Sequence, residues 1–135
     1  LGVVLIIYGV VLNIVAGRTL RLYGHRGRVP RFTPPDRLVD RGIYSCMRHP
    51  AQLGLIMVGV GLGLASGTIQ GILASAIPVA GGLLFILQVE EPEARRLLGP
   101  SYHEYEERVP ALRLTVRCLA KGWREIENAS QRRDT

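Results

Sequence analysis

Two apolar segments separated by a polar loop dominate the amino-acid sequence. Residues 1–17 contain no charged side chain, and neither does the 39-residue run from Ala51 to Val89. A membrane-spanning helix needs about 20 apolar residues, so the first segment suits one span and the second suits two. Small and polar residues around Ser66 and Gly67 mark the break in the second segment. We therefore predict an all-α membrane protein with about three spanning helices, at residues 1–17, 51–66 and 68–89.

The polar remainder divides into a basic loop and a mixed C-terminal region within one membrane domain. The loop at residues 18–50 holds eight Arg and two Asp, which accounts for the whole net charge of +6. Basic loops stay on the cytoplasmic side of a membrane, and an even number of crossings then places residues 90–124 there too. Residues 125–135 are polar, and we expect a disordered tail. A signal peptide is the competing interpretation of the first segment, which lacks a basic n-region.

An amphipathic pattern follows Pro110. Apolar side chains recur at helical spacing at Leu112, Val116, Leu119 and Trp123. Basic side chains line an adjacent face at Arg113, Arg117, Lys121 and Arg124. A helix of this kind is expected to lie in the membrane interface, and packing on the protein's own loop is the alternative.

Several other chemistries find no support in the sequence. Cys46 and Cys118 both fall on the predicted cytoplasmic side, where reducing conditions disfavour a disulfide. The three His are scattered and neither Cys has zinc spacing, so we predict no metal site. Membrane topology and anionic lipid explain the Arg-rich loop better than nucleic acid does. Small residues such as Gly59 and Gly63 favour helix packing, and such faces also permit oligomers.

The first candidate site lies where the basic loop meets the second apolar segment. Pro50 suits the first turn of a helix because it has no N–H to leave unpaired. Arg48 and His49 then stand at the positive end of that helix, an arrangement that favours a carboxylate or phosphate ligand. Arg48 is the candidate catalytic residue. In the alternative interpretation, Arg48 and His49 only anchor the helix at lipid headgroups.

The second candidate site lies where the apolar run ends. Glu90, Glu91 and Glu93 follow the last apolar residues. Acidic side chains at the C-terminus of a helix oppose its dipole, so either a cationic ligand or the Arg-rich loop must compensate them. The alternative is a solvated acidic face that pairs with Arg95 and Arg96.

Taken in order, these pieces resemble the isoprenylcysteine carboxyl methyltransferase and phospholipid methyltransferase superfamily. The resemblance covers roughly residues 36–110 and comprises Leu-Val-x-x-Gly-Ile-Tyr-x-x-x-Arg-His-Pro, an apolar hairpin, Glu-Glu, and Leu-Gly-x-x-Tyr-x-x-Tyr-x-x-x-Val-Pro. It implies an integral membrane enzyme that uses S-adenosylmethionine without a Rossmann domain. The cofactor would lie at the cytoplasmic face, between the loop before the second span and the segment after the third.

The resemblance also implies which residues contact the cofactor. They are Asp36, Arg37, Leu38, Val39, Tyr44, His49, Pro50, Ala51, Gln52 and Glu90. Gln52 stands where the family usually has Tyr, and Ile86–Val89 lacks the substrate-binding Arg of the isoprenylcysteine enzymes. The methyl acceptor therefore stays open among an isoprenylcysteine-like carboxylate, a lipid headgroup and a thiol.

Two other functions compete with this interpretation. Membrane sterol reductases resemble the superfamily in an Arg-His-Pro-like stretch and a Tyr-x-x-Tyr tail, which makes an NADPH-dependent reductase the alternative enzyme. A non-catalytic membrane protein is the third candidate.

Overall fold

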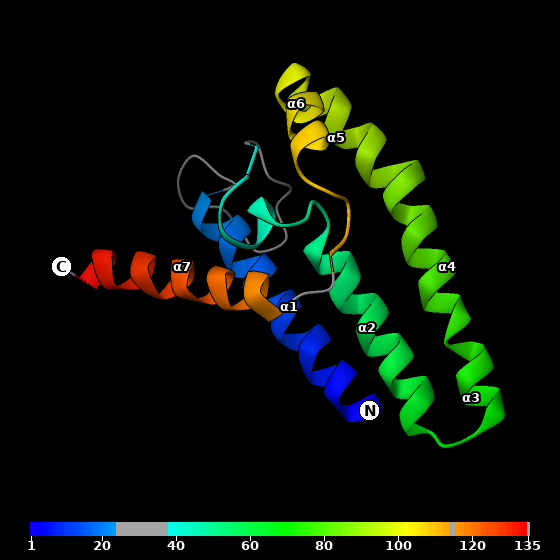
Figure 1. Ribbon diagram of the computed structural model, residues 1–135. Coiled ribbons are helices and arrows are strands. Elements are labelled where there is room, and N and C mark those ends of the chain that lie inside the picture. The colour runs from blue at the N-terminus through cyan, green and yellow to red at the C-terminus, as the bar shows by residue number, and fades with distance from the viewer. Residues whose placement is uncertain (24–37, 114–115, 135) are drawn as a thin grey trace.

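The computed structural model describes residues 1–23, 38–113 and 116–134, and the regular secondary structure of these residues is entirely helical (Figure 1). The elements are α1 (Gly2–Tyr23), the 3-10 turn η1 (Gly42–Ser45), α2 (Pro50–Ala65), α3 (Ile69–Ala74), α4 (Ala76–Phe85), the π-helical segment η2 (Ile86–Glu90), α5 (Glu91–Leu98), α6 (Pro100–Arg108) and α7 (Val116–Asp134). The predicted all-α fold is confirmed.

Two helical stretches are long and apolar enough to cross a membrane. They are Gly2–Leu22 and the continuous stretch Ile69–Leu98, which runs from α3 into α5. Pro50–Ala65 is also apolar but has 16 residues, just below the usual range of about 17–25 for a span. Two candidate spans are therefore present in the described residues, and a third crossing by α2 stays a prediction.

The apolar helices pack closely because glycines line their contacts. Helices α1 and α2 run antiparallel, with Gly2 beside Gly61 and Gly9 beside Gly54. A Cβ atom at Gly61 would lie 2.6 Å from the carbonyl oxygen of Gly2. The small-residue notch predicted at Gly59 is used within the chain, since it receives the Pro78 ring of α4. The long axis of the bundle separates the α2–α3 turn at one end from η1, α5 and α6 at the other (Figure 1).

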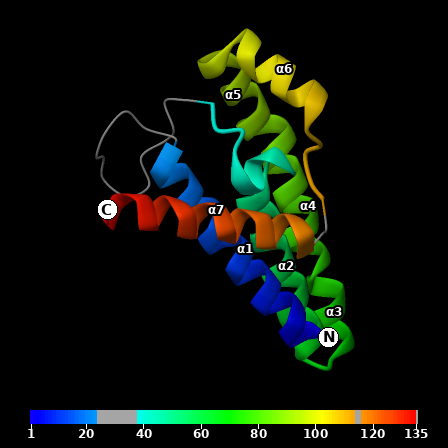
Figure 2. The same cartoon turned by 60° about the vertical axis from the view of Figure 1, so that its left-hand side comes forward.

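Helix α7 packs on the protein itself, across α1 and η1 (Figure 2). Its inward side chains include Cys118 and Ile126, which join the main buried cluster. The expected disordered tail from residue 125 is wrong, because the helix continues to Asp134 and Ile126 is buried in the core. One face of α7 therefore packs on the protein itself, as the alternative interpretation of this segment expected.

A disulfide joins Cys46, directly after η1, to Cys118 of α7. The sequence-based expectation of two free thiols is therefore wrong. The fold brings the two Cα atoms to 6.0 Å across a separation of 72 residues, which is within the range that a disulfide requires. The expectation rested on the reducing conditions of the cytoplasm, and these do not determine how close the fold brings Cys46 to Cys118.

Replacing Gly54 by Ala should destabilise the protein, whereas replacing Gly81 by Ala should not. A Cβ atom at residue 54 would lie 2.7 Å from the carbonyl oxygen of Gly9, a backbone atom that cannot move without separating α1 from α2. Overpacking of this kind costs about 1–3 kcal/mol. At Gly81, also helical, a Cβ atom would meet nothing within 4 Å. Thermal unfolding of the detergent-solubilised variants measures the difference, and equal melting temperatures would contradict the proposed helix contact.

Candidate functional site

The start of α2 is held by the chain that follows α6. The backbone N–H of Arg48 donates to the carbonyl of Pro110 at 3.0 Å, and that of His49 donates to the carbonyl of Ala111 at 3.1 Å. The Arg48 Nε atom donates to the carbonyl of Val109 at 3.0 Å. These three bonds bring the basic loop against the C-terminal region, so the two polar segments do meet at one end of the bundle.

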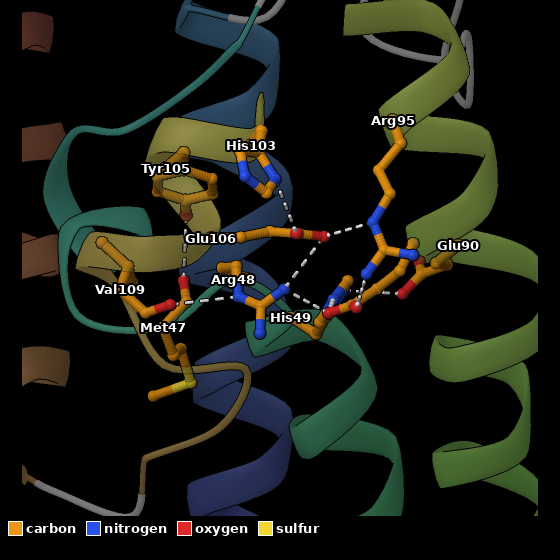
Figure 3. A network of polar contacts seen from close by, with 10 residues as sticks. Met47, Arg48, His49, Glu90, Arg95, His103, Tyr105, Glu106 and Val109 are labelled. Atoms are coloured by element: carbon orange, nitrogen blue, oxygen red, sulfur yellow. Dashed lines mark hydrogen bonds and ion pairs between the residues drawn. The ribbon is translucent and has the colours of Figure 1, made fainter. Parts of the chain in front are cut away.

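His49 lies between two consecutive carboxylates (Figure 3). Its Nδ1 atom is 2.9 Å from Glu90 Oε2, and its Nε2 atom is 3.0 Å from Glu91 Oε1. Glu90 ends the π-helical segment η2 and Glu91 begins α5; π-helical turns of this kind are frequent at functional sites. The imidazole is therefore fixed by contacts on both ring nitrogens.

Glu91 is the most heavily paired carboxylate of the site, and it is only 5% exposed. Besides His49, it accepts hydrogen bonds from Arg48 Nη1 and, at 3.2 Å, from Arg95 Nη2. A buried charge is tolerated only when it is paired in this way. Compensation of the acidic cluster by the Arg-rich loop is thus observed through Arg48, and the alternative pairing with Arg95 is observed as well.

Glu106 of α6 extends the same network. Arg95 Nε donates to Glu106 Oε1 at 2.8 Å, and Arg48 Nη1 lies 3.6 Å from the same oxygen (Figure 3). Arg48 therefore bridges the Val109 carbonyl, Glu91 and Glu106. These contacts hold the start of α2 against α5 and α6, and the candidate catalytic role of Arg48 stays a prediction.

Glu90 differs from Glu91 because it keeps an acceptor available. Gln52 Nε2 donates to Glu90 Oε1 at 3.1 Å, so the Gln that replaces the family's usual Tyr contacts the first acid of the pair. Glu90 Oε2 is buried 2.9 Å from His49 Nδ1 and, among the described residues, accepts no hydrogen bond. Buried polar atoms without partners call for an explanation such as a ligand or an ordered water.

Three tyrosines, Tyr44, Tyr102 and Tyr105, lie next to this network. Tyr105 donates its hydroxyl to the carbonyls of Tyr44 and Met47, at 2.5 and 3.3 Å. Burial, and to a lesser degree the charge of Glu90, raises the pKa of the Tyr44 phenol well above its ordinary value, so this hydroxyl stays protonated. The Tyr102 hydroxyl is buried without a hydrogen-bond partner among the described residues, and burial raises its pKa too.

The remaining residues of the expected cofactor strip fall into different surroundings. Leu38 packs beside Tyr102 and Tyr105, whereas Val39 belongs to the main core. Pro50 is fully buried at the first position of α2, and Ala51 is partly buried next to it. Asp36 and Arg37 lie outside the described residues. The structure thus brings His49, Gln52 and Glu90 into direct contact, with Tyr44 close behind.

The sequence placed Glu91 in the acidic cluster but not among the cofactor contacts, and it gave Glu106 no role in either candidate site. Glu91 carried a usable signal, because an acid at a helix end must be compensated and its neighbour Glu90 already matched the resemblance. Glu106 had none beyond its charge, since its contact with Arg95 spans 11 residues across two helices. Both residues act on Arg48 and Arg95, which hold the site together.

Comparison with known proteins places this geometry in a family. The chain matches the phospholipid methyltransferase family over residues 1–101, which include α1, α2, the acidic pair and the whole Ile69–Leu98 stretch. It is 30% identical over 114 residues to protein-S-isoprenylcysteine O-methyltransferase B of Arabidopsis thaliana. That match covers 82% of this chain and 56% of the relative, so the chain spans about half the length of this relative. No solved structure matches the chain. The chain belongs to the phospholipid methyltransferase family.

Proposed function

We propose that this protein is an integral membrane enzyme that transfers a methyl group from S-adenosylmethionine to an amphiphilic or small acceptor. Family membership gives the methyltransferase class. The observation that carries the proposal is the contact of His49 and Gln52, at the start of α2, with Glu90, whose Oε2 atom stays without a hydrogen bond. The comparisons favour no reductase, so the NADPH-dependent alternative gains nothing from them.

The site offers groups that suit both ends of this cofactor. S-adenosylmethionine supplies a methyl group activated on a sulfonium, together with an amino-acid carboxylate and ribose hydroxyls. A carboxylate suits the first turn of α2, because the backbone N–H groups of Ala51 and Gln52 precede the first helical hydrogen bonds and the dipole is positive there. The Oε2 atom of Glu90, beside His49 Nδ1, offers an acceptor that suits a hydroxyl or a positive group.

The surrounding residues would position the reactants rather than react. Glu91 fixes His49 and Arg48, and the hydroxyl of Tyr105 holds the backbone of η1 and Met47. Methyl transfer is a direct displacement, in which correct placement of the two reactants supplies a large share of the rate acceleration. A rigid, ion-paired frame around the Glu90 carboxylate is consistent with that requirement.

The acceptor is proposed as an amphiphile or small molecule that enters from the membrane. The relative in Arabidopsis is named for the O-methylation of protein S-isoprenylcysteine. In this chain, Ile86–Val89 has no Arg to bind an isoprenylcysteine-like carboxylate. A lipid headgroup or a thiol therefore stands beside the isoprenylcysteine-like carboxylate as an acceptor class. The Arg-rich loop supports a site that faces the cytoplasm.

Glu90→Gln should weaken binding of S-adenosylmethionine, and Glu93→Gln should leave it unchanged. Glu90 contributes the acceptor at the start of α2, whereas Glu93 is exposed on α5. Loss of a charge-assisted hydrogen bond is worth about 1.5–3 kcal/mol, or roughly 10- to 150-fold in affinity. Isothermal titration calorimetry on detergent-solubilised protein measures this effect, with NADPH as a second titrant. Equal affinities of the two variants would sink the assignment of Glu90.

Glu91→Gln should act mainly on stability. The substitution leaves Arg48 and His49 facing a neutral amide in a buried network, and removing one partner of a buried ion pair costs about 3–5 kcal/mol. Thermal unfolding should therefore show a much lower melting temperature for Glu91→Gln than for Glu90→Gln. If Glu91→Gln melts like the unsubstituted protein, Glu91 does not support the frame.

Cysteines introduced at Gly27 and Ser130 should both react with a membrane-impermeant thiol reagent from the cytoplasmic side. The proposed even number of crossings between these positions requires it. The native cysteines are bonded to each other and give a low background in intact vesicles. Labelling of the two positions from opposite sides would refute the three-span arrangement and the cytoplasmic site together.

A further inference from the structure

Helix α7 presents three chemically distinct sides. The first side packs on the protein through Cys118, Gly122 and Ile126. A Cβ atom at Gly122 would lie 2.8 Å from Val15 Cγ1 and 3.2 Å from Ile43 Cβ. Helix α7 is thereby seated tightly on α1 and η1, and the two other sides of the helix flank this contact.

The second side is apolar and uncovered among the described residues. Val116 is 72% exposed and Trp123 is 40% exposed, and helical spacing places them on one edge with the partly buried Leu119. The indole Nε1 atom of Trp123 donates to Glu127 Oε1 at 3.0 Å, which satisfies its polar group. An apolar ring with a satisfied N–H is typical of the boundary between a membrane and water.

The third side is basic and lies on the opposite flank of the packed face from the apolar edge. Arg117, Lys121 and Arg124 are exposed there, separated from Val116 and Trp123 by the packed face on one flank. Lys121 Nζ donates to Ser45 Oγ at 2.8 Å. The basic edge therefore lies toward η1, at the polar end of the molecule, and the apolar edge, on the other flank of the packed face, faces away from η1.

The position of α7 along α1 gives its depth. Gly122 meets α1 at Val15, which is three residues before Arg18, the first charged residue of that helix. At 1.5 Å per residue this is a distance of about 4–5 Å along the axis. The views of the molecule agree that α7 lies across α1 and does not run beside it (Figures 1 and 2). Helix α7 thus crosses the candidate span at the level where its apolar segment ends.

We propose that α7 is an in-plane membrane helix whose apolar edge, formed by Val116, Leu119 and Trp123, inserts among the acyl chains of a phospholipid leaflet. Its basic edge then lies at the level of the lipid phosphates, with which cationic side chains pair favourably. Crossing depth, segregation of the two edges and charge complementarity all select lipid as the partner. The inference is independent of the proposed methyl transfer, and α7 lies beyond the end of the family match at residue 101.

The disulfide links the position of α7 in the membrane to the position of the candidate site. Cys118 of α7 is bonded to Cys46, two residues before Arg48. A leaflet that fixes the height of α7 therefore also fixes the height of the segment that leads into the start of α2. The site would then be held at the depth where an amphiphilic molecule carries its polar head.

Trp123 is the only tryptophan of the chain, so its fluorescence reports this edge directly. The full chain is reconstituted in phosphatidylcholine vesicles whose acyl chains are brominated either near the headgroup or near the terminal methyl. Interfacial insertion places the ring about 5–10 Å into the headgroup–acyl boundary, and roughly twofold loss of fluorescence with shallow bromination and a smaller loss with deep bromination are expected. As a matched control, Trp123→Phe combined with Arg124→Trp moves the indole to the basic edge, where quenching by bromine should be weak.

The other outcomes each overturn the proposal. A ring that bromine does not quench but that aqueous acrylamide does quench faces water. A ring protected from both quenchers is covered by protein, and dependence of that protection on the protein-to-lipid ratio would identify a second copy. Stronger quenching by deep than by shallow bromine would place the ring in the hydrocarbon core. The measurement on the unsubstituted protein decides among these outcomes without any variant, and none of them depends on methyl transfer.

Discussion

The buried carboxylate of Glu91 is the interaction on which the polar end of the molecule depends. Glu91 begins α5 directly after a long apolar stretch, and it receives Arg48 and His49 from the start of α2 and Arg95 from its own helix. A carboxylate at this depth is stable only with such partners. By pairing with His49 Nε2, it turns the other ring nitrogen toward Glu90. The geometry of the candidate site is therefore a consequence of satisfying one buried charge.

The apolar helices and this charged end constrain each other. Glycine contacts allow α1 and α2 to approach closely, and the Pro78 ring fits against Gly59 between α2 and α4. These contacts provide no polar chemistry, so the ion pairs gather where the helices leave the apolar zone. Helix α2 begins inside that charged cluster and is short, with 16 residues. The first turn of α2 therefore lies in the polar region. The apolar part of the helix is correspondingly shorter than the usual length of a span.

The sequence was sufficient for the parts of the structure that depend on local pattern. Uninterrupted apolar runs predicted where the apolar helices begin to within one residue, but α1 continues to Tyr23 and the last stretch to Leu98, beyond the predicted ends at residues 17 and 89. The expected meeting of the basic loop with the acidic pair is observed, and the number of crossings behind it stays a prediction. The resemblance assigned Glu90, His49 and Gln52 to one cofactor site, and the structure brings the three side chains together, while their contact with the cofactor stays a prediction. Three features were missed because they depend on distances across the fold: the hub at Glu91, the bond between Cys46 and Cys118, and the burial of Ile126 that extends α7 to Asp134. Periodicity reports which face of a helix is apolar, but it does not report which neighbour will cover that face.

The number of hydrogen-bond and ion-pair partners differs among the charged residues of the site. Residues with many partners support the structure of the site, and Glu90, which has fewer, is better placed to bind a ligand. Arg48 bonds through Nε to the Val109 carbonyl and through Nη1 to Glu91, and Glu91 in turn has three partners, so structural contacts hold both side chains in place. Glu90 is different, because one of its oxygens receives Gln52 while the other accepts no hydrogen bond among the described residues. This second oxygen is buried beside His49 Nδ1, at 2.9 Å, and a carboxylate oxygen has two lone pairs, so it offers an acceptor to a further donor. A group that donates a hydrogen bond or carries positive charge would use that acceptor, and the start of α2 lies beside it to receive the negative end of the same ligand.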